Sequence, residues 1–244
     1  MRFLESESSQ IDGSLFFIAM PHITLVFTVH KENGKCNSME LLDIIKNINP
    51  EVIFEELSDA VYYQCYIAQT RKTLETTAIE RYLTIKNVKH IPVDTYEIPL
   101  NEHDNFNIMF EKLTRNMDFQ YFLKKQIETE YINGFPFLNG KQNDMVQSII
   151  KNYQEKFIHC SDDSNLRKIY DMWVDYNDKK ETVIIENIYN YSNSNAFTKG
   201  ILFIGSGHRK SIIRKINATK KTKMLKLDWG FYDFGVRNMQ ANGT

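Results

Sequence analysis

Four polar side chains in this chain each follow a short run that predicts a β-strand. With the run that precedes each, they are His30 (23–29), Glu56 (52–55), Asp94 (90–93) and His208 (200–205, through Gly205-Ser206-Gly207). Ligands of open parallel sheets bind outside the carboxyl ends of the strands, so the four side chains are predicted to share one cleft. Imidazoles and carboxylates together serve a hydrolytic metal site or a metal-free general acid–base pair.

Each of these residues, taken alone, is more often a cap or a loop residue. The coincidence of four favours a site, with His30, Glu56, Asp94 and His208 as catalytic candidates. His30, Glu56 and His208 are also the candidate ligands of a divalent metal such as Zn, Mn, Co or Fe.

Glycine is scarce, with 10 residues in 244, yet Gly200, Gly205 and Gly207 fall within eight positions. A strand, a glycine-rich turn and a helix beginning near Ser211 would aim backbone N–H groups at an anion or oxyanion. Gly205, Ser206, Gly207 and Arg209 are therefore the predicted substrate-binding residues. The spacing of the segment matches neither a P-loop nor a nucleophile elbow.

The elements that must position these residues alternate between strand and helix, which is typical of a parallel sheet with helical crossovers. The sequence predicts an α/β fold, with a mostly parallel sheet, flanking helices and a large helical insertion between the third and fourth core strands. Predicted strands cover 23–29, 52–55, 90–93, 200–205 and 224–229, and predicted helices 39–48 (with Ser38 as N-cap), 58–69 and 73–86. The insertion, about 103–195, is expected to hold helices at 105–130, 141–157, 166–176 and 181–191.

Composition places the chain among ordinary globular proteins. Its formal net charge is −1, which gives no general reason to bind nucleic acid, and Cys36, Cys65 and Cys160 form no disulfide framework. We expect one domain over 14–239, a frayed start at 1–13 and a short tail at 240–244. Without a recognisable leader or transmembrane segment, a cytoplasmic location is the expectation.

The motifs also resemble those of the TraB/PrgY family, over about residues 23–216. ITLVFTVH resembles the family's first strand with its histidine, PEVIFEEL its second strand, HIPVD its third strand, and GSGH its closing Gly-x-Gly-His motif. The same core occurs in Tiki metalloproteases, GumN-like proteins, erythromycin esterases and ChaN haem-binding lipoproteins.

The resemblance implies a hydrolase in which His30, Glu56 and His208 activate a water, with or without metal, to attack a peptide or ester carbonyl. Glu56 would be the base. The chain departs from the family pattern at Phe27, and at Thr95 and Asn187, where the family has arginines. The alternative is therefore a non-catalytic binder of a small molecule or peptide, as a degenerate member of the family would be; the oligomeric state stays open.

Other polar residues have simpler interpretations. Glu55 is expected at the surface or behind Glu56, on the opposite face of its strand. His90 opens a strand at the wrong edge and is expected to be structural. Residues 209–226 carry eight basic side chains and no acidic one. They could attract an anionic substrate, a nucleic acid or a membrane, or form a solvated helix face; nucleic acid is the least favoured partner.

Overall fold

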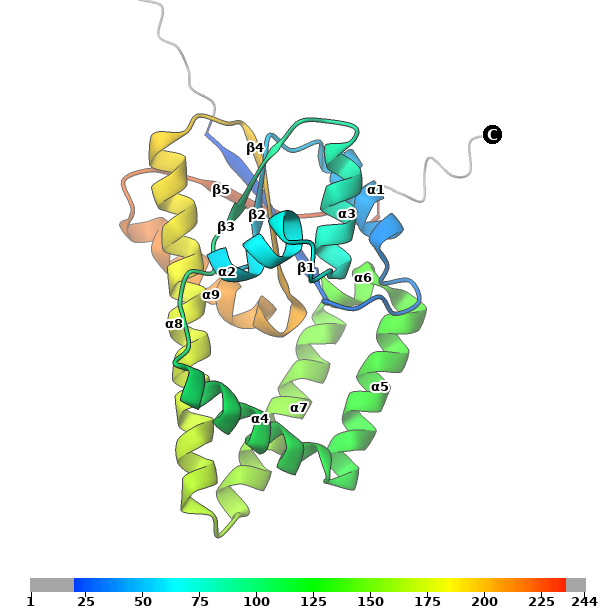
Figure 1. Cartoon of the computed structure of the whole chain (residues 1–244), viewed down its shortest axis with the longest axis vertical. Coiled ribbons are helices and arrows are strands. Elements are labelled where there is room, and N and C mark those ends of the chain that lie inside the picture. Colours follow the sequence, from blue (N-terminus) through cyan, green and yellow to red (C-terminus); the bar gives the residue numbers. More distant parts are fainter. Residues whose placement is uncertain (1–19, 236–244) are drawn as a thin grey trace, which may run out of the picture.

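The computed structural model describes residues 20–235, and their core is a five-stranded parallel sheet in the order β3-β2-β4-β1-β5 (Figure 1). The strands are β1 (His22–Thr28), β2 (Val52–Glu55), β3 (Lys89–Pro92), β4 (Lys199–Gly205) and β5 (Asp228–Phe231). The predicted fold class is confirmed. The predicted termini, 1–13 and 240–244, lie outside the described residues.

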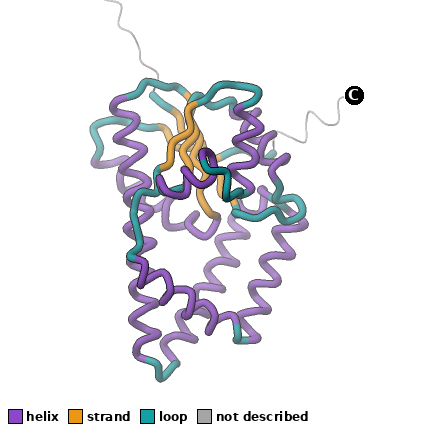
Figure 2. Tube along the Cα trace, in the orientation of Figure 1, coloured by secondary structure: helices purple, strands orange, loops and turns teal. Residues whose placement is uncertain are grey.

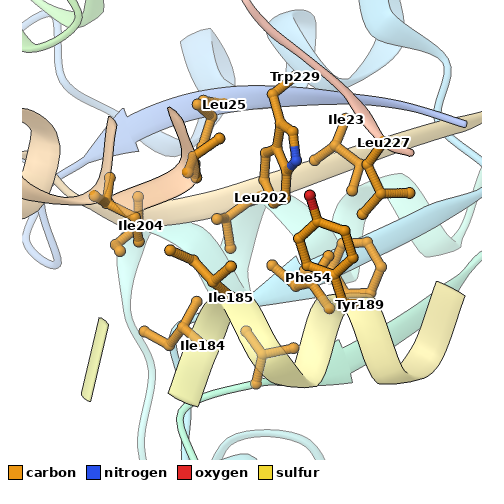
Figure 3. Close-up of a cluster of buried hydrophobic side chains, with 14 of the residues drawn as sticks. Ile23, Leu25, Phe54, Ile184, Ile185, Tyr189, Leu202, Ile204, Leu227 and Trp229 are labelled. Carbon is orange, nitrogen blue, oxygen red and sulfur yellow. The ribbon is translucent and has the colours of Figure 1, made fainter. Parts of the chain in front are cut away.

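Helices cover both faces of the sheet because its central strands are buried on both sides. One face packs against α1 (Ser38–Ile48), α3 (Leu74–Leu83) and α6 (Phe135–Leu138), and the other against α8 (Ser164–Ser194) and α9 (Arg209–Thr222). Figure 3 shows Phe54 and Leu202 of the sheet facing Ile185 and Tyr189 of α8. Each fully buried side chain of this size contributes about 1.5–3 kcal/mol.

The helical insertion lies between β3 and β4 and extends beyond the carboxyl edge of the sheet (Figures 1 and 2). It consists of α4 (Leu100–Thr114), α5 (Met117–Asn133), α6, α7 (Lys141–Cys160) and α8. Its helices enclose a separate apolar core around Met109, Phe119 and Tyr170. Helix α8 contributes buried side chains both to this core and to that of the sheet, so it joins the insertion to the strands.

Two predicted helix boundaries in the insertion are wrong. The expected single helix 105–130 is broken, because the Asn116 side chain accepts hydrogen bonds from the backbone N–H groups of Asp118 and Phe119 and so starts α5. The expected pair 166–176 and 181–191 is one helix of 31 residues. The expected break at 177–180 is absent, and the Lys180 side chain within it reaches inward to Glu56 and Asp94.

Smaller differences concern the ends of elements. Asn37, rather than Ser38, caps α1, since its side chain accepts from two N–H groups of the first turn. The expected helix 58–69 is α2 (Asp59–Tyr62) followed by a π-helical turn (Tyr63–Ile67). The last strand begins at Asp228 instead of residue 224, because Lys226 Nζ bonds to the Lys220 and Lys223 carbonyls and closes a loop after α9.

The three clustered glycines have different environments. A Cβ atom on Gly200 would lie 3.1 Å from Phe197 and 3.3 Å from both Phe54 and Val52. A Cβ atom on Gly207 would meet nothing within 4 Å. Neither Gly205 nor Gly207 has positive φ, so close packing at Gly200, rather than a special backbone turn, is the clear requirement for glycine here.

We therefore predict that Gly200→Ala lowers the free energy of unfolding by about 1–3 kcal/mol through overpacking. Gly207→Ala, its matched control, should change it by no more than about 0.5 kcal/mol. Urea denaturation measures both. Equal stability of the two variants would show that the side chains around Gly200 can move aside for a methyl group at no cost.

Candidate functional site

Three of the four strand-end residues meet at the carboxyl edge of the sheet, around the ammonium group of Lys180. Lys180 Nζ lies 2.7 Å from Glu56 Oε1 and 3.0 Å from Asp94 Oδ2. His208 Nε2 lies 3.4 Å from the same Glu56 oxygen. Glu56, Asp94 and His208 follow β2, β3 and β4. These strands are neighbours in the sheet, so the side chains at their carboxyl ends converge as predicted. We call Glu56, Asp94, Lys180, His208 and Glu181 the charge cluster.

Glu56 is held ionised at the centre of the cluster. Burial opposes its charge, since only 7 % of the side chain is exposed, but Lys180 and His208 outweigh burial and hold the pKa of the carboxyl far below its usual range. The backbone N–H of Gly205 also donates to Glu56 Oε2 at 2.5 Å. Glu56 thus has donors on both oxygens and a very low proton affinity.

Asp94 has the opposite tendency. Burial raises its pKa, and the neighbouring Lys180 only partly offsets that effect. Its Oδ2 bonds to Lys180, while Oδ1 is buried with no hydrogen-bond partner among the described residues. Asp94 is therefore the carboxyl of the cluster that more readily carries a proton.

His208 is fixed as an imidazolium by carboxylates on both ring nitrogens. Its Nδ1 lies 2.9 Å from Glu181 Oε1, and Ser211 Oγ donates to the other Glu181 oxygen at 2.5 Å. Burial lowers the pKa of His208, but Glu56 and Glu181 more than compensate and raise it to about 9. The positive charge on this ring is therefore kept at neutral pH.

His30 lies beside the charge cluster and belongs to a second group. Its Nδ1 is 3.0 Å from Glu75 Oε1, which also accepts a hydrogen bond from Thr28. The Glu75 hydrogen bond raises the pKa of His30, and the charges of Glu56 and Lys180 reach it with opposite signs. With 57 % of its side chain exposed, His30 is the member of the predicted set that is most open to solvent.

Glu55 and His90 form a separate pair on the other face of β2. Glu55 is only 2 % exposed, which makes the expectation of a surface residue wrong. Its carboxylate bonds to His90 Nδ1 at 2.8 Å and to the Tyr66 hydroxyl at 2.6 Å. Both oxygens are thus satisfied, and no predicted site residue takes part.

Two of the four predicted substrate-binding residues at 205–209, Gly205 and Arg209, are already engaged within the protein. The N–H of Gly205 is bound to Glu56, and Ser206 is buried with its carbonyl accepting from Asn143. Arg209 is paired with Asp144, and its guanidinium lies over the Phe27 ring. As placed, Gly205 and Arg209 hold the site together and are not free to bind a substrate.

The two positions where the resemblance expects arginine are in contact. Asn187 Nδ2 donates to Thr95 Oγ1 at 2.8 Å and to the Val93 carbonyl at 3.0 Å. A neutral pair therefore lies next to Asp94, at the two positions where the family pattern has arginines. This edge of the site presents no positive charge from these two positions.

The donors do not fit a divalent metal. Within residues 20–235, no group of three or more His, Cys, Asp or Glu side chains is arranged to hold one. His30 contacts Glu75 instead of Glu56, and the Lys180 ammonium takes the position beside Glu56 that a cation would need.

A cavity of about 510 Å³ lies at the opposite edge of the sheet, where β2 and β3 begin. It is lined by residues such as Val52, Lys89 and Phe197 and includes none of the predicted site residues. The convergence of charged groups, rather than this cavity, identifies the candidate site.

Sequence reasoning missed Lys180, Glu181 and Glu75. Lys180 was assigned to a break between helices and Glu181 to the start of the second one, although Glu181 lies three and four residues before Ile184 and Ile185, on the buried stripe of α8. A charged residue at an apolar position of a helix is the signal that would have found it. Glu75, which is buried in the first turn of α3, carries no comparable signal.

Comparison with known proteins found no matching family model, no similar curated protein and no similar solved structure. The TraB/PrgY resemblance therefore stays a prediction. Among the described helices, none is long and apolar enough to cross a bilayer.

The role of Lys180 can be tested against its neighbour. Lys180→Met leaves two buried carboxylates without their shared cation, and we expect it to lower the free energy of unfolding by about 3–5 kcal/mol at pH 7. The loss should shrink as the pH falls, because Glu56 and Asp94 can then take up protons. Urea denaturation at several pH values measures the effect.

Lys179→Met is the matched control. Lys179 belongs to the same helix but forms an exposed pair with Asp175, so its loss should leave the free energy of unfolding nearly unchanged. Similar losses in the two variants would mean that burial of the Lys180 ammonium contributes little.

Proposed function

We propose that the protein is a hydrolase that acts on a peptide or ester carbonyl without a metal. The observation that supports this best is the pair His30–Glu75 at the end of β1, next to a cluster that holds a second, protonated histidine. A neutral imidazole can act as a general base, and the charge of a protonated imidazole at the same edge can stabilise an oxyanion. The protein's substrate is a small molecule or a peptide in this proposal.

His30, rather than Glu56, is the better base. Glu56 is surrounded by donors, and its low pKa makes it a weak proton acceptor. With Nδ1 bound to Glu75, His30 keeps Nε2 available to accept a proton from water. Glu75 orients the ring and stabilises the imidazolium that forms.

The other cations serve the developing negative charge. Water attacks the carbonyl carbon as His30 takes its proton, and the carbonyl oxygen becomes an oxyanion that His208 stabilises by its positive charge. Collapse of this intermediate breaks the bond to the leaving group, which receives the proton from His30. Lys180 offsets the negative charges of Glu56 and Asp94, which would otherwise oppose the oxyanion.

A non-catalytic binder of the same fold is the second candidate. Two features favour it. Thr95 and Asn187 form a neutral contact that offers no charge to a substrate, and both oxygens of Glu56 are already bound by donors within the protein. Such a protein would retain a ligand through purification and would show no turnover. The predicted cytoplasmic location is compatible with either candidate.

The pH dependence of hydrolysis tests the proposed roles of His30 as the base and of His208 as the positive charge. We expect kcat/KM for a peptide and ester panel to rise through the pKa of His30, which lies above 6.5, and to fall above about 9 as His208 loses its proton. His30→Gln should lower kcat by about 10²–10⁴-fold and remove the acid limb of the profile.

His159→Gln is the control, because His159 is an exposed residue at the end of α7. It should leave both rate and profile unchanged. Turnover by the wild type that equals that of His30→Gln would end the hydrolase proposal and favour the binder.

Metal dependence is a separate test. We expect titration calorimetry with Zn, Mn, Co or Fe to show no saturable binding that depends on the predicted ligands, because Lys180 and the His208 proton oppose a second cation. Binding that both His30→Ala and His208→Ala abolish would restore the metal-dependent mechanism. Chelator treatment of the purified protein provides the matching activity measurement.

A further inference from the structure

The solvent face of α9 carries a row of basic side chains outside the candidate site. Lys210, Arg214 and Lys221 are exposed and lie at positions i, i+4 and i+11, so they share one face of the helix. The opposite face is buried through Ile212 and Ile216. The row is thus fixed in space by the packing of α9 on the sheet (Figure 1).

Few of these charges are neutralised within the protein. Asp178 pairs with Lys215 at 2.6 Å and lies 4.0 Å from Arg214, whereas Lys210 and Lys221 form no ion pair with any described residue. No acidic residue occurs between 209 and 226. With a chain charge of only −1, this surface is a local concentration of positive charge.

An apolar side chain stands at the end of the row. Met224 is 97 % exposed, in the loop that follows α9. Lys226 Nζ bonds to the Lys220 and Lys223 carbonyls, which pins this loop against the helix end and presents Met224 outward. The loop therefore has a fixed position, and it exposes one methionine between Lys223 and Lys226.

We propose that α9 and the loop after it bind an anionic lipid surface. Lysine and arginine side chains are attracted to acidic headgroups, and an exposed apolar tip can enter the interface between headgroups and acyl chains. Single-stranded nucleic acid is the less favoured partner, because residues 209–226 contain no aromatic side chain for stacking on bases. The proposal is independent of hydrolysis at the strand ends.

Co-sedimentation of the full chain with vesicles tests the proposal. We expect binding to vesicles of phosphatidylcholine mixed with phosphatidylserine at low salt, loss of that binding as salt rises, and no binding to phosphatidylcholine alone. Each basic residue near such a surface strengthens partitioning about fivefold, so K210Q/R214Q/K221Q should weaken it on the order of a hundredfold. M224S should weaken it a few-fold without changing its salt dependence.

The control is K124Q/K156Q/K168Q, which removes three exposed lysines of the helical insertion and leaves α9 intact. It should bind like the wild type, and circular dichroism should show both triple variants folded. Failure to bind the mixed vesicles, equal loss in the two triple variants, or displacement from vesicles by duplex DNA at equal phosphate would each overturn the lipid proposal.

Discussion

The ammonium group of Lys180 lies between two buried carboxylates that come from neighbouring strand ends. Glu56 follows β2 and Asp94 follows β3, and parallel strands bring such residues to one edge whether or not their charges are compatible. Two carboxylates this close together and shielded from water cannot both stay ionised without a cation. Without Lys180, the convergence of these two carboxylates would destabilise the fold. The other contacts of the site therefore depend on Lys180.

Lys180 is supplied by the last helix of the insertion, α8. Lys180 and Glu181 lie near the middle of α8, which packs in the insertion core at one end and on the sheet at the other. A single helix anchored in two cores holds its side chains in a fixed position over the strand ends. Adjacent residues on it then serve different partners: Lys180 neutralises the carboxylates of the sheet, and Glu181 holds the imidazolium of His208.

Much of this could be read from the sequence, and the remainder could not for a physical reason. The runs before His30, Glu56, Asp94 and His208 are continuous and apolar, so strand positions and their shared edge follow from local pattern. Lys180 and Glu181 are charged, and charge indicates exposure unless its partner is known. Their partners lie 124 and 27 residues away, at Glu56 and His208. The position of Glu181 on the buried stripe of α8 marks it as unusual, but no local pattern identifies the partner of either residue. The same local view predicted a loop where α8 is continuous.

The surroundings of each group also decide which one can act as a base. Glu56 and Asp94 are both buried acids beside one lysine, yet their pKa values move in opposite directions. Glu56 has His208 and the Gly205 N–H in addition to Lys180, whereas one Asp94 oxygen has no partner. Residue type would make Glu56 the base, but the count of donors around it makes it a fixed anion that organises the cations. In the proposed reaction the proton acceptor is therefore His30, which is solvent-exposed and hydrogen-bonded to Glu75, and whose pKa is affected by the charges of Glu56 and Lys180.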